Sequence, residues 1–230
     1  MSGNSKQSKY AEIVAARQAC RKCAGVYNPA AINDGGLDSD HVGPWTGWQG
    51  NLNADLMVVG QDWGGHEYFV KFGGKEKDRN PTNIRLKTFL KDVGFEIDLP
   101  EHATGSGDLY FTNAILCCRE GLLTENATTN TKSVKSIWFR LCEPLLRSQI
   151  ELVNPKAIAT LGYYAYRSVL SSFGIQPEPT MRAALQSSGL HVVGARSIVV
   201  PVYHCGNNGL RSRKLENQRA DWARVKAALG

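Results

Sequence analysis

The sequence predicts an α/β fold: a three-layer αβα sandwich around a four-stranded, mainly parallel sheet. Four short apolar runs lack the alternation of a half-exposed strand, so they suit strands buried on both faces. Segments of helical composition separate these runs, and alternating strands and helices are typical of a parallel sheet with helices on both sides. The predicted strands are residues 54–59, 109–112, 157–161 and 197–202.

The predicted helices lie around these strands, at about residues 9–22, 81–93, 133–152, 162–173 and 213–229. Residues 24–53 are rich in Gly, Asn, Asp and Pro, so we expect a long ordered loop on the body of the domain. Residues 174–196 carry no readable pattern. We expect a single domain over residues 1–230, with a flexible tail over residues 1–8.

Composition excludes several classes of protein. The 230 residues are 42% hydrophobic and 21% charged, as in a globular protein with a real core, which excludes disorder for most of the chain. No apolar run approaches the ~18 residues of a transmembrane helix, and residues 1–9 lack a signal-peptide core. We therefore expect a cytoplasmic protein with no membrane partner. A net charge of +6 is compatible with a polyanionic partner.

Polar residues follow the predicted strands, and the carboxyl ends of strands are where sites form in open parallel sheets. Asp62 could orient or activate a water molecule, or it could cap the next helix. Backbone N–H groups around Gln61 could receive a developing anion. Asn113 has donors and an acceptor in one plane that match a nucleobase edge, or it could tie down its own loop. His204 could hydrogen-bond an accumulating negative charge.

Two nearby segments could contact a nucleic acid. One aromatic residue after the Asp62 loop could stack on a flipped base, although such residues more often pack a core. The segment after His204 is expected to be a flexible tip with one apolar wedge, suited to inserting into a duplex, or else an ordinary turn. The aromatic residues are Tyr68, Phe69 and Phe72, and the tip comprises Asn207, Asn208, Gly209, Leu210 and Arg211.

Cysteine spacing indicates metal or redox chemistry. The chain has six cysteines, and Cys20 and Cys23 form a CxxC pair. In a reducing compartment such a pair is a metal or redox motif before it is a disulfide.

Taken in order, the strand ends resemble the uracil-DNA glycosylase superfamily over about residues 15–225. The matching segments are ADLMVVGQDWG (54–64), LYFTNA (109–114), NPKAIATLG (154–162) and VPVYH (200–204). They are similar to the family's water-activating loop, its base-reading Asn strand, its third strand and its His-containing intercalating loop.

This resemblance implies a monomeric, nucleoid-associated enzyme of DNA base-excision repair. Such an enzyme flips uracil or a related deaminated base from DNA and hydrolyses its N-glycosidic bond, leaving an abasic site. Asp62 would position the water, His204 and the Gln61 backbone would stabilise the anionic base, Asn113 would read the base, and Leu210 would fill the vacated stack. The alternatives are a catalytically inactive nucleic-acid-binding member, or a metal-stabilised protein that acts on a free nucleotide.

The water-activating loop is a hybrid. Gly60, Gln61 and Asp62 are similar to the classical enzymes, whereas Gly64 and Glu67 resemble the iron–sulfur branch of the superfamily. Classical members carry a Tyr two residues after the Asp, and that Tyr excludes the thymine methyl group. Gly64 stands at this position, so the methyl gate must come from elsewhere or be absent. Gly60 and Gly64 are expected to border the base.

The cysteines are similar to those of the iron–sulfur branch, which has an N-terminal CxxC, a third Cys after the Asn strand and a fourth at the start of the next helix. The resemblance implies a structural 4Fe–4S cluster that holds the N-terminal helix and the 119–132 loop. Tetrahedral zinc is the chemical alternative, and four unrelated thiols are another. The ligands would be Cys20, Cys23, Cys142 and either Cys117 or Cys118.

Overall fold

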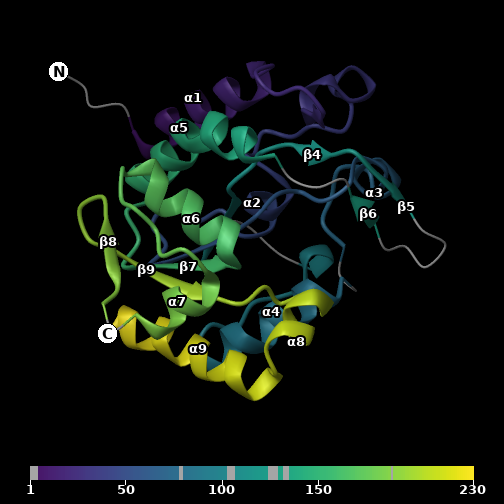
Figure 1. Ribbon diagram of the computed structural model, residues 1–230. Helices are drawn as coiled ribbons and strands as arrows, with labels where there is room; N and C mark the ends of the chain where they lie inside the picture. Colours follow the sequence, from purple (N-terminus) through teal and green to yellow (C-terminus); the bar gives the residue numbers. More distant parts are fainter. Residues whose placement is uncertain (1–4, 78–79, 103–106, 124–128, 132–134, 188) are drawn as a thin grey trace.

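The computed structural model describes residues 5–77, 80–102, 107–123, 129–131, 135–187 and 189–230 (Figure 1). A five-stranded sheet in the order β3-β2-β7-β9-β8 forms its centre. The first four strands are parallel, and β8 pairs antiparallel with β9. The strands are β2 (Leu56–Gly60), β3 (Tyr110–Asn113), β7 (Ala157–Leu161), β8 (His191–Val193) and β9 (Ser197–Val202).

The prediction of an α/β fold with a mainly parallel central sheet is confirmed, but the number of strands was wrong. All four predicted strands lie within three residues of their expected bounds. The fifth strand, β8, comes from residues 174–196, where no pattern was readable. It has three residues and lies at the edge of the sheet, so it carries no long apolar run.

Side chains alternate along each parallel strand between two separate cores. Met57 and Val59 face one core, whereas Leu56 and Val58 face the other. Helices α5 (Ser136–Val153) and α6 (Tyr163–Ser172) cover the first core, and α4 (Pro81–Asp92) and α9 (Leu215–Leu229) cover the second. Figure 1 shows these two helical layers on opposite sides of the sheet. The continuous apolar runs therefore reflect strands buried on both faces.

Local sequence signals define where the long helices begin and end. Helix α4 starts at Pro81, and the Asn80 side chain caps it by accepting a hydrogen bond from Thr82 N at 2.9 Å. Helix α5 ends at Asn154, whose φ of 53° is the left-handed conformation that stops a helix. Helices α4 and α9 are joined by a stack of Phe89 on Trp222, with ring centroids 5.7 Å apart.

The segment before β2 is ordered, as predicted, and contains short elements. The Thr46 hydroxyl donates to the Phe111 carbonyl oxygen at 2.6 Å, and Phe111 N–H donates to the Gln49 carbonyl oxygen at 2.8 Å. These bonds attach the segment to β3, at the outer edge of the sheet. Its elements are β1 (Val26–Tyr27), η1 (Pro29–Ala31), η2 (Asn33–Gly35) and α2 (Pro44–Trp48), and β1 pairs with β4 (Cys118–Arg119).

Residues 5–8, predicted to be part of a flexible tail, are instead ordered at the start of a helix. Helix α1 (Lys6–Ala19) begins at Lys6, and the Ser5 side chain caps it by accepting from Ser8 N at 3.2 Å. The Lys6 ammonium also donates to the Leu52 carbonyl oxygen at 2.8 Å. Capping and anchoring therefore hold residues 5–8 in a helix that packs on α5, and residues 1–4 lie outside the described residues.

The remaining elements are short. They are α3 (His66–Lys71), η3 (Pro100–His102), β5 (Gly121–Leu123), β6 (Thr129–Thr131), α7 (Met181–Gln186) and α8 (Asn207–Ser212). Strands β5 and β6 pair antiparallel within the predicted 119–132 loop. In the part of the chain that the structure describes, no helix has both the length and the apolar character needed to cross a membrane.

Candidate active site

The carboxyl ends of the central strands bring three of the predicted polar residues into one region. Gly60 and Asn113 are register partners on neighbouring strands, and the Asn113 Nδ2 donates to the Asp62 carbonyl oxygen at 3.2 Å. His204 lies just beyond the end of β9, where the negative charge of Asp62 acts on the pKa of its imidazole. At the end of β7, a Cβ added to Gly162 would lie 3.8 Å from the His204 Cβ. The sheet therefore assembles one polar site from distant segments.

Gly60 leaves space that the Asn113 amide and an unexpected aromatic ring fill. A Cβ at this position would lie 2.5 Å from Asn113 Nδ2 and 2.9 Å from Cζ3 of Trp45. Trp45 belongs to α2, in the segment that the sequence indicated only as a loop. No spacing motif marks this tryptophan, because its position depends on how the loop folds onto β3. Trp45 is thus a wall of the site that sequence reasoning missed.

The Asp62 carboxylate is held by two hydrogen-bond donors and one ion pair. Its Oδ1 accepts from Gly64 N–H at 2.8 Å, while Oδ2 accepts from Gln61 Nε2 at 2.6 Å and lies 2.9 Å from Arg119 Nε. Only 3% of the Asp62 side chain is exposed. Asp62 does not cap the next helix, because the N-cap of α3 is Gly65 and no side chain caps it.

Arg119 was not assigned a site role from the sequence. It lies on β4, where its N–H donates to the Gly64 carbonyl oxygen at 2.8 Å, so β4 runs beside the Asp62 turn. Its guanidinium has 14% exposure and pairs with the buried Asp62 carboxylate. A carboxylate with this many fixed donors has a set orientation.

Gly64 faces open space. Its φ is +79°, a conformation that favours glycine, and no atom lies within 4 Å of the position that a Cβ would occupy. The structure therefore leaves open space beside the Asp62 turn at Gly64.

His204 is held as a neutral hydrogen-bond donor. Burial lowers its pKa from 6.5, and the negative charge of Asp62 partly opposes this shift. Its Nδ1 accepts from Gly206 N–H at 2.9 Å, which assigns the proton of the neutral ring to Nε2. The Nε2–H of this neutral imidazole can donate a hydrogen bond to a developing anion.

The segment after His204 is a short helix, α8, rather than the flexible tip that the sequence predicted. Arg85 on α4 anchors it: Nη1 donates to the Cys205 carbonyl oxygen at 3.0 Å and Nη2 donates to Asn207 Oδ1 at 2.8 Å. This cross-link from a distant helix orders the tip. Within the segment, Asn207, Asn208 and Arg211 are exposed, Leu210 is half-buried and Gly209 is buried.

The three candidate stacking residues do not meet at the site. Phe69 is 4% exposed, packs with Ile32 and stacks on Trp63, so it is part of the core, and its role in stacking on a base stays a prediction. Tyr68 and Phe72 are half-buried, with ring centroids 4.6 Å apart. Burial, together with the charge of Glu76, raises the pKa of Tyr68 to about 12.

Four cysteine thiols share one neighbourhood. Cys20 ends α1, Cys23 follows it, Cys117 lies after β3 and Cys142 lies on α5. Burial raises the pKa of Cys117, and the charges of Cys142, Cys23 and Cys20 raise it further. Burial also raises the pKa of Cys142 to about 11, with contributions from Cys23 and Cys20. The pKa values of Cys117 and Cys142 thus respond to the charges of Cys20 and Cys23, although the two pairs are far apart in sequence.

Cys118 faces elsewhere. Burial raises its pKa, followed by the charges of Cys117 and Asp62, and its side chain packs with Ile32 and Phe69. Cys117 is thus the residue of this pair that faces the other three thiols. Among the described residues, no three His, Cys, Asp or Glu side chains are gathered closely enough to hold a metal ion. Four thiols are the donor type that binds an iron–sulfur cluster or a zinc ion, so the residues fit such a centre in their chemistry.

Comparison with known proteins adds a family match. The family model of the uracil DNA glycosylase superfamily matches residues 48–226, more than three quarters of the 230 residues. None of the curated proteins matches the sequence significantly. The matched range includes Asp62, Asn113 and His204, and it begins after the CxxC pair.

Proposed function

The chain belongs to the uracil DNA glycosylase superfamily, and on that premise we propose that it excises uracil or a related deaminated base from DNA. Members of this superfamily are DNA glycosylases, which hydrolyse the bond between base and sugar. The observation that carries the proposal is the convergence of Asp62, Asn113 and His204 at the carboxyl edge of the sheet. These groups supply an acceptor, a base-reading amide and an anion-stabilising donor.

Base recognition is assigned to the Asn113 amide. The Trp45 ring and the bare backbone of Gly60 border the space beside this amide and would fix its orientation toward a flipped base. Reading a base by its Watson–Crick edge is typical of enzymes that flip their target. Open space at Gly64 supports a range that extends beyond uracil, because no side chain there would exclude a larger base.

Bond cleavage is assigned to His204 and Asp62. When the C1′–N bond breaks, its electron pair leaves with the base, and the oxygen of a water molecule bonds to C1′ and releases a proton. The Nε2–H of His204 would donate to the anionic base, aided by backbone N–H groups near Gln61. The fixed carboxylate of Asp62 would favour the cationic sugar electrostatically and orient the water.

DNA contact is assigned to α8 and the residues around it. Leu210 is half-buried and could enter the space that the flipped base vacates. Its neighbours Asn207, Asn208 and Arg211 are exposed on the same short helix, where they could contact the backbone, and Gly209 gives that helix its close fit. The net charge of +6 favours such a contact. We propose that a monomer carries the whole site.

A structural metal centre is assigned to Cys20, Cys23, Cys117 and Cys142. A 4Fe–4S cluster bound there would cross-link α1, the segment after β3 and α5, and zinc bound by the same thiolates would do so equally. The Trp138 Nε1 already donates to the Ala24 carbonyl oxygen at 3.0 Å, which ties the turn after Cys23 to α5. Iron, sulfide and zinc analysis of purified protein distinguishes the two centres.

One observation favours a second candidate, a DNA-binding member without catalysis. The Asp62 carboxylate has only 3% exposure and is engaged by two hydrogen-bond donors and an ion pair with Arg119, so little of it can reach a water molecule. Binding to uracil-containing or abasic DNA without product formation would favour this candidate.

The proposed function is tested with oligonucleotides that each carry one labelled site: uracil, hypoxanthine, xanthine or mismatched thymine. Alkali cleaves the strand wherever the base has been removed. Cleavage at uracil, with less at the other bases, is the expected result. Cleavage at another base alone would keep the reaction and change the specificity. No cleavage of any substrate by metal-replete protein would refute the proposed activity.

A further inference from the structure

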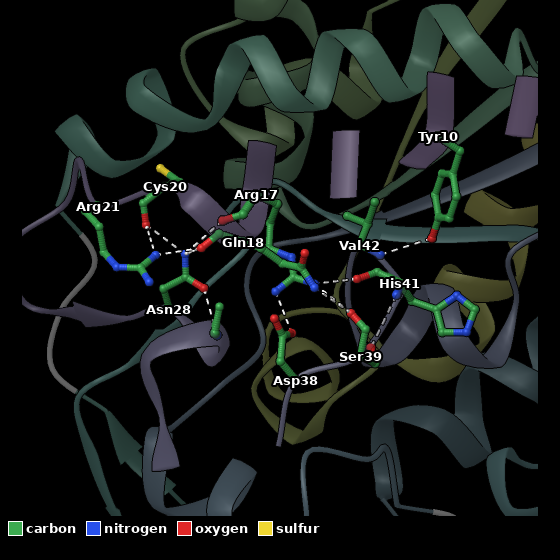
Figure 2. A network of polar contacts seen from close by, with 11 residues as sticks. Tyr10, Arg17, Gln18, Cys20, Arg21, Asn28, Asp38, Ser39, His41 and Val42 are labelled. Carbon is green, nitrogen blue, oxygen red and sulfur yellow. Dashed lines mark hydrogen bonds and ion pairs between the residues drawn. The ribbon is translucent and has the colours of Figure 1, made fainter. Parts of the chain in front are cut away.

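Arg17 is a buried arginine at the end of α1, outside the range that the family model matches. Only 1% of its side chain is exposed. Its Nη1 pairs with Asp38 Oδ1 at 2.5 Å, and its Nη2 donates to the carbonyl oxygens of Ser39 at 3.1 Å and His41 at 2.7 Å. Figure 2 shows this guanidinium at the centre of the network, with Asp38, Ser39 and His41 converging on it.

The same guanidinium lies against the residue that follows Asp62. The Arg17 Cζ is 5.7 Å from the ring centroid of Trp63, which is cation–π distance. Trp63 also stacks on Phe69, with centroids 5.9 Å apart. Gly43 makes room for this ring, because a Cβ there would lie 2.5 Å from Trp63 Cζ2. Trp63 is therefore fixed on several sides, and Arg17 provides one of them.

Trp63 lies within the turn whose backbone holds the Asp62 carboxylate. Trp63 joins Asp62 to Gly64, and Gly64 N–H holds Asp62 Oδ1 at 2.8 Å. A shift of the indole would therefore move one of the two hydrogen-bond donors on the carboxylate. Displacement of a catalytic group by about 1 Å can cost about a hundredfold in rate.

Stability alone does not account for Arg17. A buried ion pair is often no more stable than apolar residues of similar volume, because both charges lose their water. Among the described residues, Arg17 Nε and Asp38 Oδ2 are buried with no hydrogen-bond partner. Such incompletely paired groups cost free energy and call for a reason other than packing.

We propose that Arg17 is a positioning residue that holds Trp63, and through it the Asp62–Gly64 turn, in the geometry needed for cleavage. This inference rests on the proposed function and extends it to a segment outside the family match. The same last turn of α1 leads to Cys20: Asn28 Nδ2 donates to the carbonyl oxygens of Arg17 and Cys20, both at 2.8 Å (Figure 2). The last turn of α1 would thus both position the Asp62–Gly64 turn, through Arg17, and place the Cys20 thiol.

The test measures single-turnover cleavage of uracil DNA and the dissociation constant for abasic DNA in Arg17→Lys, Trp63→Phe and the double variant. Arg17→Lys retains the charge that faces Asp38 but loses the planar face on Trp63. We expect it to lower the cleavage rate about tenfold, with DNA affinity unchanged within about twofold. The double variant should be no slower than the slower single variant, because both changes disturb one contact.

Arg219→Lys is the matched control, because Arg219 lies on α9 in an exposed pair with Asp92. We expect it to cleave like wild type. A wild-type rate in Arg17→Lys, or rate losses that multiply in the double variant, would overturn the positioning role. Wild type that cleaves nothing would instead refute the proposed function.

Hydrogen exchange of backbone amides at residues 61–65 gives a readout that does not need activity. Arg17→Lys is expected to speed exchange at Gly64, whereas Arg219→Lys is not. Unchanged exchange in Arg17→Lys would overturn the proposal even if wild type is inactive. If Arg17→Lys does not fold, Trp63→Phe carries the same test of rate and exchange.

Discussion

Breaking the pair between Asp62 and Arg119 should destabilise the protein more than breaking an exposed pair does. Asp62→Asn leaves the amide oxygen to accept from Gly64 N–H, but it turns an NH₂ group toward Gln61 Nε2 and Arg119. Arg119→Met removes the cation and leaves the carboxylate with two donors. The pair is 2.9 Å apart, with side-chain exposures of 3% for Asp62 and 14% for Arg119.

The expected magnitude follows from this burial. Removing one member of a buried ion pair costs ~3–5 kcal/mol, because the other charge stays buried and unpaired. Arg119 keeps some contact with water, so we expect the lower end, about 3 kcal/mol for each single variant. The double variant should cost less than the sum of the single variants, with a coupling free energy of about 2 kcal/mol.

Urea unfolding of wild type, the two single variants and the double variant, at matched metal content, measures these free energies of unfolding. Arg219→Met, which breaks the exposed pair with Asp92 at 3.1 Å, is the control and should cost less than ~1 kcal/mol. A coupling free energy below ~0.5 kcal/mol between Asp62 and Arg119 would mean that water screens the pair, and the account of a fixed carboxylate would be refuted.

Three further predictions concern the site and the thiols. Gly60→Ala should lower the unfolding free energy by about 1–3 kcal/mol and displace the Asn113 amide, seen as a fall in cleavage rate larger than the fall in DNA affinity. Because burial lowers the pKa of His204, the unfolded chain binds that proton first as pH falls through 6.5. Wild type should therefore lose thermal stability relative to His204→Gln below pH 6.5 but not above it, and equal pH profiles would contradict this. Cys117→Ser should lose bound iron or zinc by elemental analysis while Cys118→Ser retains it, and the reverse pattern would exchange the two assignments.

The long elements could be predicted because their signals are local. Strands β2, β3, β7 and β9 carry continuous apolar runs, and α4 carries both a capping Asn and a first-turn Pro. Helices α2, α3 and α8 have five or six residues, too few to show a helical period. Strand β8 has only three residues and lies at the edge of the sheet, where Val192 is 55% exposed. It therefore carries no apolar run of the kind that marks a buried strand.

The site was predictable where it depends on strand ends and unpredictable where it depends on contacts between distant segments. Asp62, Asn113 and His204 follow parallel strands, and parallel strands end at one edge of the sheet. Arg119 reaches Asp62 because β4 runs beside the Gly64 turn, and Trp45 reaches Gly60 because its loop folds onto β3. Neither contact has a signature in residue spacing, because each joins segments that only the folded chain brings together.

Single-turnover cleavage of a uracil-containing oligonucleotide by wild type, His204→Ala and His102→Ala tests the central claim most directly. His102 is exposed on η3, before β3, and serves as the matched control. The account predicts cleavage by wild type and His102→Ala, and a rate about 10²–10³-fold lower in His204→Ala, comparable to the loss of an oxyanion donor. Equal rates in wild type and His204→Ala would contradict the assigned site, and no cleavage by metal-replete wild type would contradict the proposed reaction itself.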